Sequence, residues 1–255
     1  MQKKIQNKIN FYKENGYCIL KLLDISDINY IEKNITKLIF PEKKNKNKLI
    51  ENYHKLVNDD YTHNQKMDSS KRYIKLNKKI NCKLRGEFLK IITKSYWGHS
   101  KFDLFWVGNT KKGELKKNHT GFRISRPQNN IKSDDSAGGH IDRNIGGELR
   151  KEADLVITMW IPIKGYSKNY TLRIAPKSHK INHSVAFKKN SKITPVISKK
   201  YENKFSFIRP NMKKGEVMII NPNLLHGGST NKGSKSRVSL DIRAINLKKI
   251  KNIVN

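Results

Sequence analysis

The sequence predicts one mostly β domain with helices in its N-terminal part. Apolar residues at helical spacing are found within residues 1–100. Short apolar or alternating segments, separated by Gly, Pro and Asn, fill residues 101–247, a pattern typical of a β sandwich or barrel. No internal repeat and no linker divides the 255 residues, so we expect residues 1–255 to form a single domain.

Residues 1–40 are predicted to form a helix, a strand and a second helix. Asn15-Gly16 is a turn signal that precedes the short apolar strand Tyr17-Cys18-Ile19-Leu20. Ser26 is the expected N-cap of the second helix. The apolar residues that would share one face of that helix are Ile28, Ile31, Ile35 and Leu38.

The rest of the N-terminal part is less regular. Residues 41–71 are rich in Lys and Asn and show weak periodicity, so they are either a loop or an insertion that shapes a substrate entrance. From residue 72 to residue 96, apolar residues at helical spacing predict one long helix or two consecutive ones.

The second part of the chain is predicted to consist of strands. Its first strand covers residues 102–107, and a polar loop at residues 128–139 leads to His140. The other expected strands cover residues 121–126, 154–163, 170–175, 205–208, 215–220 and 237–247.

The composition is strongly basic, with 54 Lys and Arg against 21 Asp and Glu and a net charge of +33. Such a charge is compatible with a nucleic acid, an anionic membrane surface or an anionic substrate as the partner. Lys, Asn and Ile are enriched together, however, and the positive charge forms no single block. An AT-rich coding bias therefore explains the charge more simply than a dedicated binding tail.

The cysteines and the hydropathy favour a soluble, cytoplasmic protein. Cys18 and Cys82 lie far apart and show no metal-type spacing, which is typical of a reduced protein rather than a disulfide-linked secreted one. No apolar run approaches the ~20 residues that a membrane-spanning helix needs. The basic N-terminus is not followed by the apolar core of a signal peptide.

Two short stretches carry the candidate chemistry, Gly138-Gly139-His140-Ile141-Asp142 and His226-Gly227-Gly228. In an extended segment residues two apart project to the same side, so His140 and Asp142 can bind one ion, although such a pair alone is more often part of a solvated loop. His226 follows a predicted strand and the Asn221-Pro222 turn, where it can point into a barrel mouth. Two imidazoles and one carboxylate suit an open iron(II) site better than a closed zinc site.

The last predicted strand alternates strictly, with Arg237, Ser239, Asp241 and Arg243 on one face. A half-buried strand that faces water shows the same alternation. Alternatively, the arginines form a pocket for a carboxylate, because a guanidinium binds a carboxylate through two parallel hydrogen bonds. Both interpretations stay open at this point.

Together these motifs resemble the iron(II)/2-oxoglutarate-dependent dioxygenases, and within them the phytanoyl-CoA dioxygenase-like group. The resemblance spans most of the chain, and the order and spacing of its pieces are more specific than any single piece. The matching pieces are Phe11-x-x-x-Asn15-Gly16-Tyr17, His140-Ile141-Asp142, the strand with Trp160, residues 172–179, Gly215-Glu216-Val217, and His226 with Arg237 eleven residues later. The chain departs from the group's pattern at Asn169-Tyr170-Thr171 and Pro176-Lys177, which bear on loop shape rather than on iron binding.

The resemblance implies a fold, a ligand set and an activity. The implied fold is a double-stranded β-helix, a jelly-roll and cupin-like core over residues 101–247, with N-terminal helices packed on one sheet. His140, Asp142 and His226 would hold Fe(II), and O2 and 2-oxoglutarate would complete the centre. The implied reaction is hydroxylation with formation of succinate and CO2, and the presence of Asp142 favours hydroxylation over halogenation.

The resemblance also implies roles for residues around the iron. Arg237 would bind the C5 carboxylate of 2-oxoglutarate, and Ser239 would add a hydrogen bond. Trp160 would line the same pocket, although a core tryptophan is an equally good interpretation. On inward parity, Arg123 is a candidate for binding the substrate, and so is Arg243, whereas Arg126 would face the other side of its strand.

The substrate is predicted to be a small molecule, with an anionic group suggested only by the basic composition. One alternative is the same chemistry on a nucleic acid or a protein, because Arg237 and Arg243 are spaced as in AlkB-like demethylases. The absence of an evident aromatic cluster for stacking a flipped base disfavours a nucleic acid. Another alternative is a jelly roll that binds sugars without catalysis. The sequence predicts neither the identity of the substrate nor the oligomeric state.

Overall fold

A computed structural model describes residues 2–43, 48–68, 71–107, 114–128, 138–142, 156–183 and 197–250. Its helices are α1 (Gln2–Asn15), α2 (Ile25–Ile39), α3 (Tyr53–Leu56), α4 (Asp60–Lys66), α5 (Lys78–Leu84), α6 (Glu87–Trp97), α7 (Lys199–Glu202), α8 (Leu247–Ile250) and the 3-10 turn η3 (Ser178–Lys180). Its strands are β1 (Tyr17–Lys21), β2 (Tyr73–Lys75), β3 (Phe102–Val107), β4 (Leu115–Lys117), β5 (His119–Ser125), β6 (Val156–Lys164), β7 (Arg173–Ile174), β8 (Glu216–Ile220), β9 (His226–Gly227) and β10 (Arg237–Asn246).

The first helix and strand form as predicted, but the cap of α2 does not. Gly16 has a φ of +79°, which lets the chain leave α1 and enter β1 at once. The predicted N-cap Ser26 is wrong, because Asp24 occupies that position. The Asp24 carboxylate accepts a hydrogen bond from the Asp27 amide at 2.9 Å, and the Asp27 carboxylate accepts one from the Asp24 amide at 3.0 Å. This reciprocal pair is a capping box, and it starts the helix before Ser26.

The buried face of α2 also differs by one residue from the prediction. Leu38 is 47% exposed, whereas Ile39 is buried. At about 100° per residue, Leu38 and Ile39 lie just beyond opposite edges of the stripe made by Ile28, Ile31 and Ile35, and the fold buries the edge with Ile39.

The segment from residue 72 to residue 96 contains more elements than predicted. It begins with β2, which pairs with β5, and continues as two helices. The Asn77 side chain accepts a hydrogen bond from the Ile80 amide at 2.9 Å, so the first of these helices cannot start before residue 78. Gly98, with a φ of +76°, ends the second.

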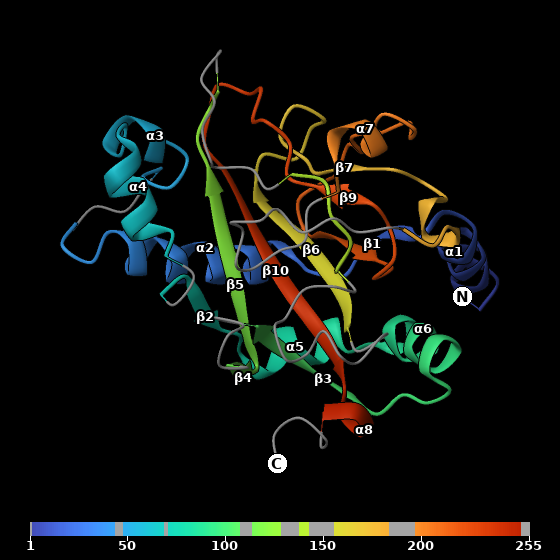
Figure 1. Cartoon of the computed structure of the whole chain (residues 1–255). Coiled ribbons are helices and arrows are strands. Elements are labelled where there is room, and N and C mark those ends of the chain that lie inside the picture. The colour runs from blue at the N-terminus through green and yellow to red at the C-terminus, as the bar shows by residue number, and fades with distance from the viewer. Residues whose placement is uncertain are drawn as a thin grey trace.

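The main sheet is antiparallel and is built around β10. Within the described residues it has eight strands, in the order β1-β8-β6-β10-β3-β4, with β5 between β10 and β2. Strand β10 pairs with β6 on one side and with β5 and β3 on the other (Figure 1). Side chains of three neighbouring strands therefore lie next to those of the long β10.

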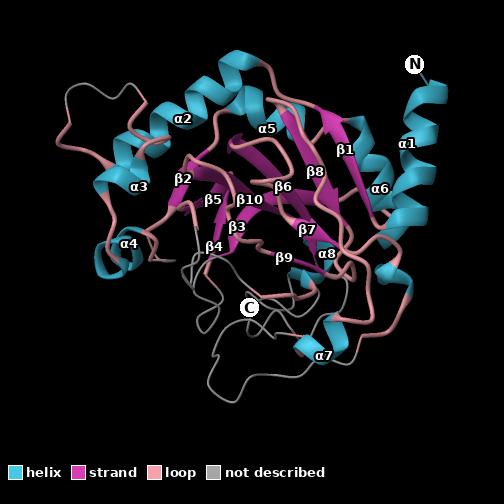
Figure 2. Ribbon diagram, turned by 90° about the horizontal axis from the view of Figure 1, so that it is seen from above, coloured by secondary structure: helices cyan, strands magenta, loops and turns pink. Residues whose placement is uncertain are grey.

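The sheet has one apolar face and one face with polar side chains. The largest apolar cluster includes Phe122, Ile161 and Leu240 of the sheet together with the buried residues of α2, α5 and α6. Figure 2 shows α2 and α5 on one side of the strands and β7 and β9 on the other. Because side chains alternate along a strand, Ser239, Asp241 and Arg243 face away from the helices. We call this second face the inner face.

The small sheet formed by β7 and β9 brings distant segments together. Ile174 pairs with His226, and His140 pairs with His226 on the other side, so His226 lies between two backbone partners. The predicted strand over residues 205–208 is reduced to a single bridge between Ile208 and Ile174, and the one over residues 170–175 to Arg173–Ile174. Both predictions were too long, because β7 pairs with β9 over only two residues and residues 205–208 pair with β7 only at Ile174.

The described part of residues 41–71 contains α3 and α4 and packs on the rest of the fold, so it is more than a loop. Ile50, Tyr53 and Val57 belong to the main apolar cluster. The Ser236 amide donates a hydrogen bond to the Glu51 carbonyl at 3.0 Å, next to the start of β10. The segment therefore supports the end of β10 that carries Arg237.

No helix in the described parts of the chain combines the length and the apolar composition needed to cross a membrane. Cys18 is buried and Cys82 is exposed, and both are free thiols.

Candidate metal centre

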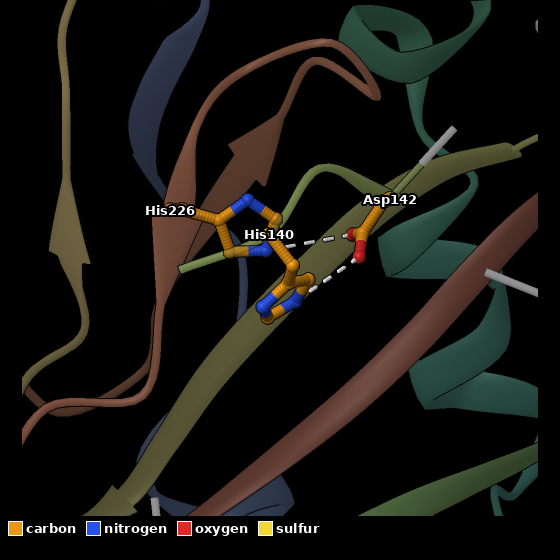
Figure 3. Close-up of side chains that lie close together, drawn as sticks. All are labelled: His140, Asp142 and His226. Atoms are coloured by element: carbon orange, nitrogen blue, oxygen red, sulfur yellow. Dashed lines mark ion pairs between the residues drawn. The ribbon is translucent and has the colours of Figure 1, made fainter. Parts of the chain in front are cut away.

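Three side chains that could bind a metal ion meet on the inner face of the main sheet. His140 Nε2 lies 3.6 Å from Asp142 Oδ1, and His226 Nε2 lies 3.7 Å from Asp142 Oδ2. One ligand atom from each residue lies within 4.8 Å of the other two (Figure 3). Asp142 and His226 are buried and the His140 side chain is 12% exposed, so the group is shielded from bulk water.

Backbone pairing places these side chains. The His140 amide donates to the His226 carbonyl at 2.8 Å, and the His226 amide donates to the His140 carbonyl at 3.0 Å. This pairing sets the two rings 4.5 Å apart between centroids. Asp142 follows His140 by two residues and contacts the main sheet at Thr158 of β6. The centre thus lies between the small sheet and the main sheet.

The hydrogen bonds of the imidazoles leave the same atom free on both. His140 Nδ1 lies 2.9 Å from the Gly138 carbonyl, and His226 Nδ1 lies 2.9 Å from the Leu224 carbonyl. A carbonyl only accepts, so Nδ1 is the donor in each ring, and in the neutral ring Nε2 keeps its lone pair. This is the tautomer that metal-binding histidines use.

Of the two carboxylate oxygens of Asp142, one has a hydrogen-bond partner and the other has none. Oδ2 accepts a hydrogen bond from the Thr158 hydroxyl. Oδ1 is buried and has no hydrogen-bond partner, and it faces His140 Nε2. An unsatisfied buried carboxylate oxygen costs free energy unless a cation or a donor compensates it. These donors therefore fit a metal ion that takes both Nε2 atoms and Oδ1.

The charges at the centre favour the forms that bind a metal. Burial raises the pKa of Asp142, but the Arg243 guanidinium and the two imidazoles more than offset this, so its pKa is well below the ordinary value. Burial lowers the pKa of His226 to about 4, against the opposing effect of Asp142. Near neutral pH, Asp142 would therefore offer a carboxylate and His226 a neutral imidazole to a metal ion.

The shifted pKa of His226 predicts a loss of stability in acid. A pKa of about 4 in the folded state, below the ordinary 6.5, means that the unfolded state binds more protons between these values. The contribution of His226, about 3 kcal/mol, is present above pH 6.5 and is lost as the pH falls towards 4. Urea unfolding of the apo-protein at pH 7.0, 5.5 and 4.5 measures it. His226→Gln should lose less stability over this range, and equal losses in both proteins would contradict the prediction.

Arg237, at the start of β10, lies in a buried cradle. Its guanidinium donates to the Tyr170 carbonyl at 3.0 Å, the Ser229 carbonyl at 3.2 Å and the Ser125 hydroxyl at 2.7 Å. The side chain is fully buried. Ser239 is buried two residues further along β10, on the same face. The sequence interpretation of a strand facing water is therefore wrong at Arg237 and Ser239.

Two other site residues predicted from the sequence, Arg123 and Trp160, also lie on the inner face. Arg123 of β5 is the cross-strand partner of Ser239. Trp160 of β6 pairs with Asp241 and packs in an apolar cluster with Leu172 and Met218. Trp160 thus has the packing of a core tryptophan and also shares a face with the candidate centre.

Arg243 contacts the centre itself. Its Nη2 lies 3.6 Å from Asp142 Oδ1, and its Nη1 forms an ion pair with Asp241. The cross-strand partner of Arg243 on β6 is Thr158, so both residues reach Asp142 from neighbouring positions of the sheet.

Sequence reasoning missed Thr158 as a partner of Asp142. The signal was a hydroxyl residue, on the same face as Trp160, within the otherwise apolar β6 segment. The Gly138 and Leu224 carbonyls that orient the imidazoles are backbone groups, so the residue types do not indicate them. Asp134 and Asp135, the carboxylates of the predicted polar loop at residues 128–139, lie outside the described residues.

Comparison with known proteins finds a family model that matches the part of the chain with the candidate centre. The model of the phytanoyl-CoA dioxygenase (PhyH) family matches residues 125–239, a range that contains His140, Asp142, His226 and Arg237. The matched part of the chain is similar to the PhyH family. This agrees with the resemblance inferred from the motifs. No curated protein matches the sequence.

Solved structures share the fold of this chain. The epimerase SnoN, solved with Fe3+, alpha ketoglutarate and nogalamycin RO, matches with a TM-score of 0.58 and 9% identity, over 96% of this chain and 85% of SnoN. The non-heme alpha ketoglutarate dependent carbocyclase SnoK matches with a TM-score of 0.58 and 11% identity, over 94% of this chain and 83% of SnoK. AviO1 from Streptomyces viridochromogenes Tue57 matches with a TM-score of 0.53 and 14% identity, over 95% of each chain. At these identities the likeness establishes a common fold.

Proposed function

We propose that this chain is an iron(II)/2-oxoglutarate-dependent oxygenase of the PhyH family that acts on a small molecule. His140 Nε2, His226 Nε2 and Asp142 Oδ1 are its iron ligands. The observation that carries the proposal is that three ligand atoms with free lone pairs lie within 4.8 Å of one another. Two imidazoles and one carboxylate leave open positions on an octahedral ion, as oxygen chemistry requires.

Arg237 is the proposed partner of the cosubstrate. It is a buried cation on the same strand as Arg243, which contacts the centre. A planar guanidinium suits the C5 carboxylate of 2-oxoglutarate, and its hydrogen bonds to Tyr170, Ser229 and Ser125 hold it in place. Ser239 and Trp160, which share the inner face, are proposed to line the same site.

The residues of the chain position and protect the reacting groups. Bound iron would supply the activation of O2 coupled to decarboxylation of the cosubstrate. The Gly138 and Leu224 carbonyls fix the two imidazole rings, and Thr158 holds Oδ2 so that Oδ1 faces the ion. The burial of Asp142 and His226 keeps water away from the ligands, which strengthens electrostatic interactions there.

Hydroxylation is the proposed outcome, with succinate and CO2 as coproducts. The presence of Asp142 favours it over halogenation, because halogenating relatives lack this carboxylate. The similar structures include an epimerase and a carbocyclase, so the mass of the product is the measurement that separates these outcomes. A gain of one oxygen atom supports hydroxylation, and an unchanged mass or a loss of two hydrogens contradicts it.

The finer features of the fold and of the substrate are also proposals. We propose a single domain over residues 1–255 with a double-stranded β-helix core, supported by the antiparallel main sheet and by the small sheet on its inner face. A small molecule is favoured as the substrate, since SnoN was solved with one. An anionic group on the substrate has the net charge of +33 as its only support. Arg123 is the proposed substrate contact.

The test is an assay of succinate release with Fe(II), 2-oxoglutarate, O2 and a panel of small molecules. We expect at least one compound to stimulate release and to be oxidised in proportion. His226→Ala should abolish the activity, whereas His99→Ala, a histidine outside the centre, should retain it. Release that depends on no compound and persists in His226→Ala would contradict the proposal.

A further inference from the structure

Arg243 lies between two carboxylates of different exposure. Its Nη2 is 3.6 Å from Oδ1 of the fully buried Asp142, and its Nη1 is ion-paired with Asp241, whose side chain is 48% exposed. The Arg243 side chain itself is 9% exposed. The guanidinium thus connects the candidate metal ligand to a carboxylate that reaches solvent. Arg243 also lies beyond residues 125–239, the range that the family model matches.

The oxygen that Arg243 approaches is the one that a metal ion would take. Oδ2 is satisfied by the Thr158 hydroxyl, whereas Oδ1 has no hydrogen-bond partner. At 3.6 Å the guanidinium attracts Oδ1 by charge but is too distant for a hydrogen bond. The contact therefore neutralises the carboxylate without closing the oxygen to another cation.

A buried carboxylate needs a positive charge nearby in the apo-protein. Removing the partner of a buried charge costs several kcal/mol, because the remaining charge is left uncompensated. The two imidazoles donate through Nδ1 to carbonyls, and neither forms a hydrogen bond with Asp142 Oδ1. Among the described residues, Arg243 is the arginine or lysine paired with Asp142.

We propose that Arg243 is the counter-ion of Asp142 in the apo-protein and that a metal ion bound at Oδ1 takes over this role. Asp241 then retains the guanidinium. The inference rests on the proposed metal centre, and it makes Arg243 a charge partner of that centre rather than a contact of the substrate.

The inference predicts the direction in which removal of Arg243 changes the affinity for a metal ion. A residue that only orients Asp142 would weaken metal binding when it is removed, typically by 10–100-fold. A counter-ion competes with the metal, because two cations near one oxygen repel each other. Removing Arg243 should therefore destabilise the apo-protein and tighten metal binding. Removing Asp241 should instead weaken metal binding, because the guanidinium then has only Asp142 as its partner.

The experiment titrates Co(II), a redox-stable probe, into the full-length apo-protein and follows urea unfolding with and without Co(II). For Arg243→Met we expect an affinity for Co(II) about tenfold higher than that of the wild type and a lower unfolding midpoint without metal. Arg243→Lys should stay close to the wild type, because the charge is kept. Asp241→Asn changes a half-exposed residue and should bind Co(II) several-fold more weakly.

Arg126→Met is the matched control. The Arg126 side chain is also 9% exposed and also pairs with an aspartate, Asp60, but it lies outside the centre. Its Co(II) affinity should equal that of the wild type, which excludes a general effect of the net charge. Equal or weaker Co(II) binding by Arg243→Met would overturn the inference while leaving the metal centre intact. If Arg243→Met does not fold, unchanged or tighter binding by Asp241→Asn would overturn it. A wild-type protein that binds no Co(II) would overturn the metal centre itself.

Discussion

Asp142→Asn is expected to lower the affinity for Fe(II) or Co(II) by about 100-fold or more and to abolish oxygenase activity. The substitution removes the single charged ligand from the set of three. It also places a donor where an acceptor is needed. Because the Thr158 hydroxyl donates to Oδ2, the asparagine carbonyl should turn to Thr158 and its amide group towards His140 Nε2. The amide would then satisfy a lone pair that the metal requires.

This variant should fold, which makes the result interpretable. The asparagine has the same shape, keeps the bond to Thr158 and removes a fully buried charge, and Arg243 keeps Asp241 as its partner. Urea unfolding without metal checks the fold, and Co(II) titration measures the affinity. Asp60→Asn, an exposed aspartate paired with Arg126, is the control. Wild-type metal affinity in a folded Asp142→Asn protein would remove Asp142 from the centre.

The local parts of the centre were predictable from the sequence, because short-range geometry sets them. His140 and Asp142 are two residues apart in an extended segment, so their side chains reach one point. The alternation along β10 likewise placed Arg237, Ser239 and Arg243 on one face. That His226 joins His140 was inferred only from the order of the motifs, because the backbone pairing of the two residues is a long-range contact.

The contacts around Asp142 could not be predicted, because they depend on the register between strands. Thr158 and Arg243 reach Asp142 only because β6 and β10 pair with these two residues opposite each other. A shift of either strand by one residue would turn the side chain that it contributes to the other face. The prediction for residues 205–208 failed for a related reason, since apolar residues mark burial but do not say whether a partner strand is available.

Arg237→Lys is expected to weaken the binding of 2-oxoglutarate to the Co(II)-loaded protein by about 100-fold. A lysine keeps the charge but cannot form two parallel hydrogen bonds with a carboxylate. Its three N–H donors also cannot make the donations to Tyr170, Ser229 and Ser125 and bind a carboxylate as well. We therefore expect an additional loss of about 2 kcal/mol in the free energy of unfolding. Calorimetric titration of 2-oxoglutarate and urea unfolding measure the two effects separately.

The two roles of Arg237, holding the cosubstrate and filling a buried cradle, are separated by Ser125→Ala. This variant removes one acceptor of the guanidinium and keeps the arginine, so it should lose stability while binding 2-oxoglutarate within about threefold of the wild type. If Arg237→Lys folds and binds 2-oxoglutarate as the wild type does, Arg237 is structural. Arg123, the cross-strand partner of Ser239, would then be the next cation to test as the partner of the cosubstrate carboxylate.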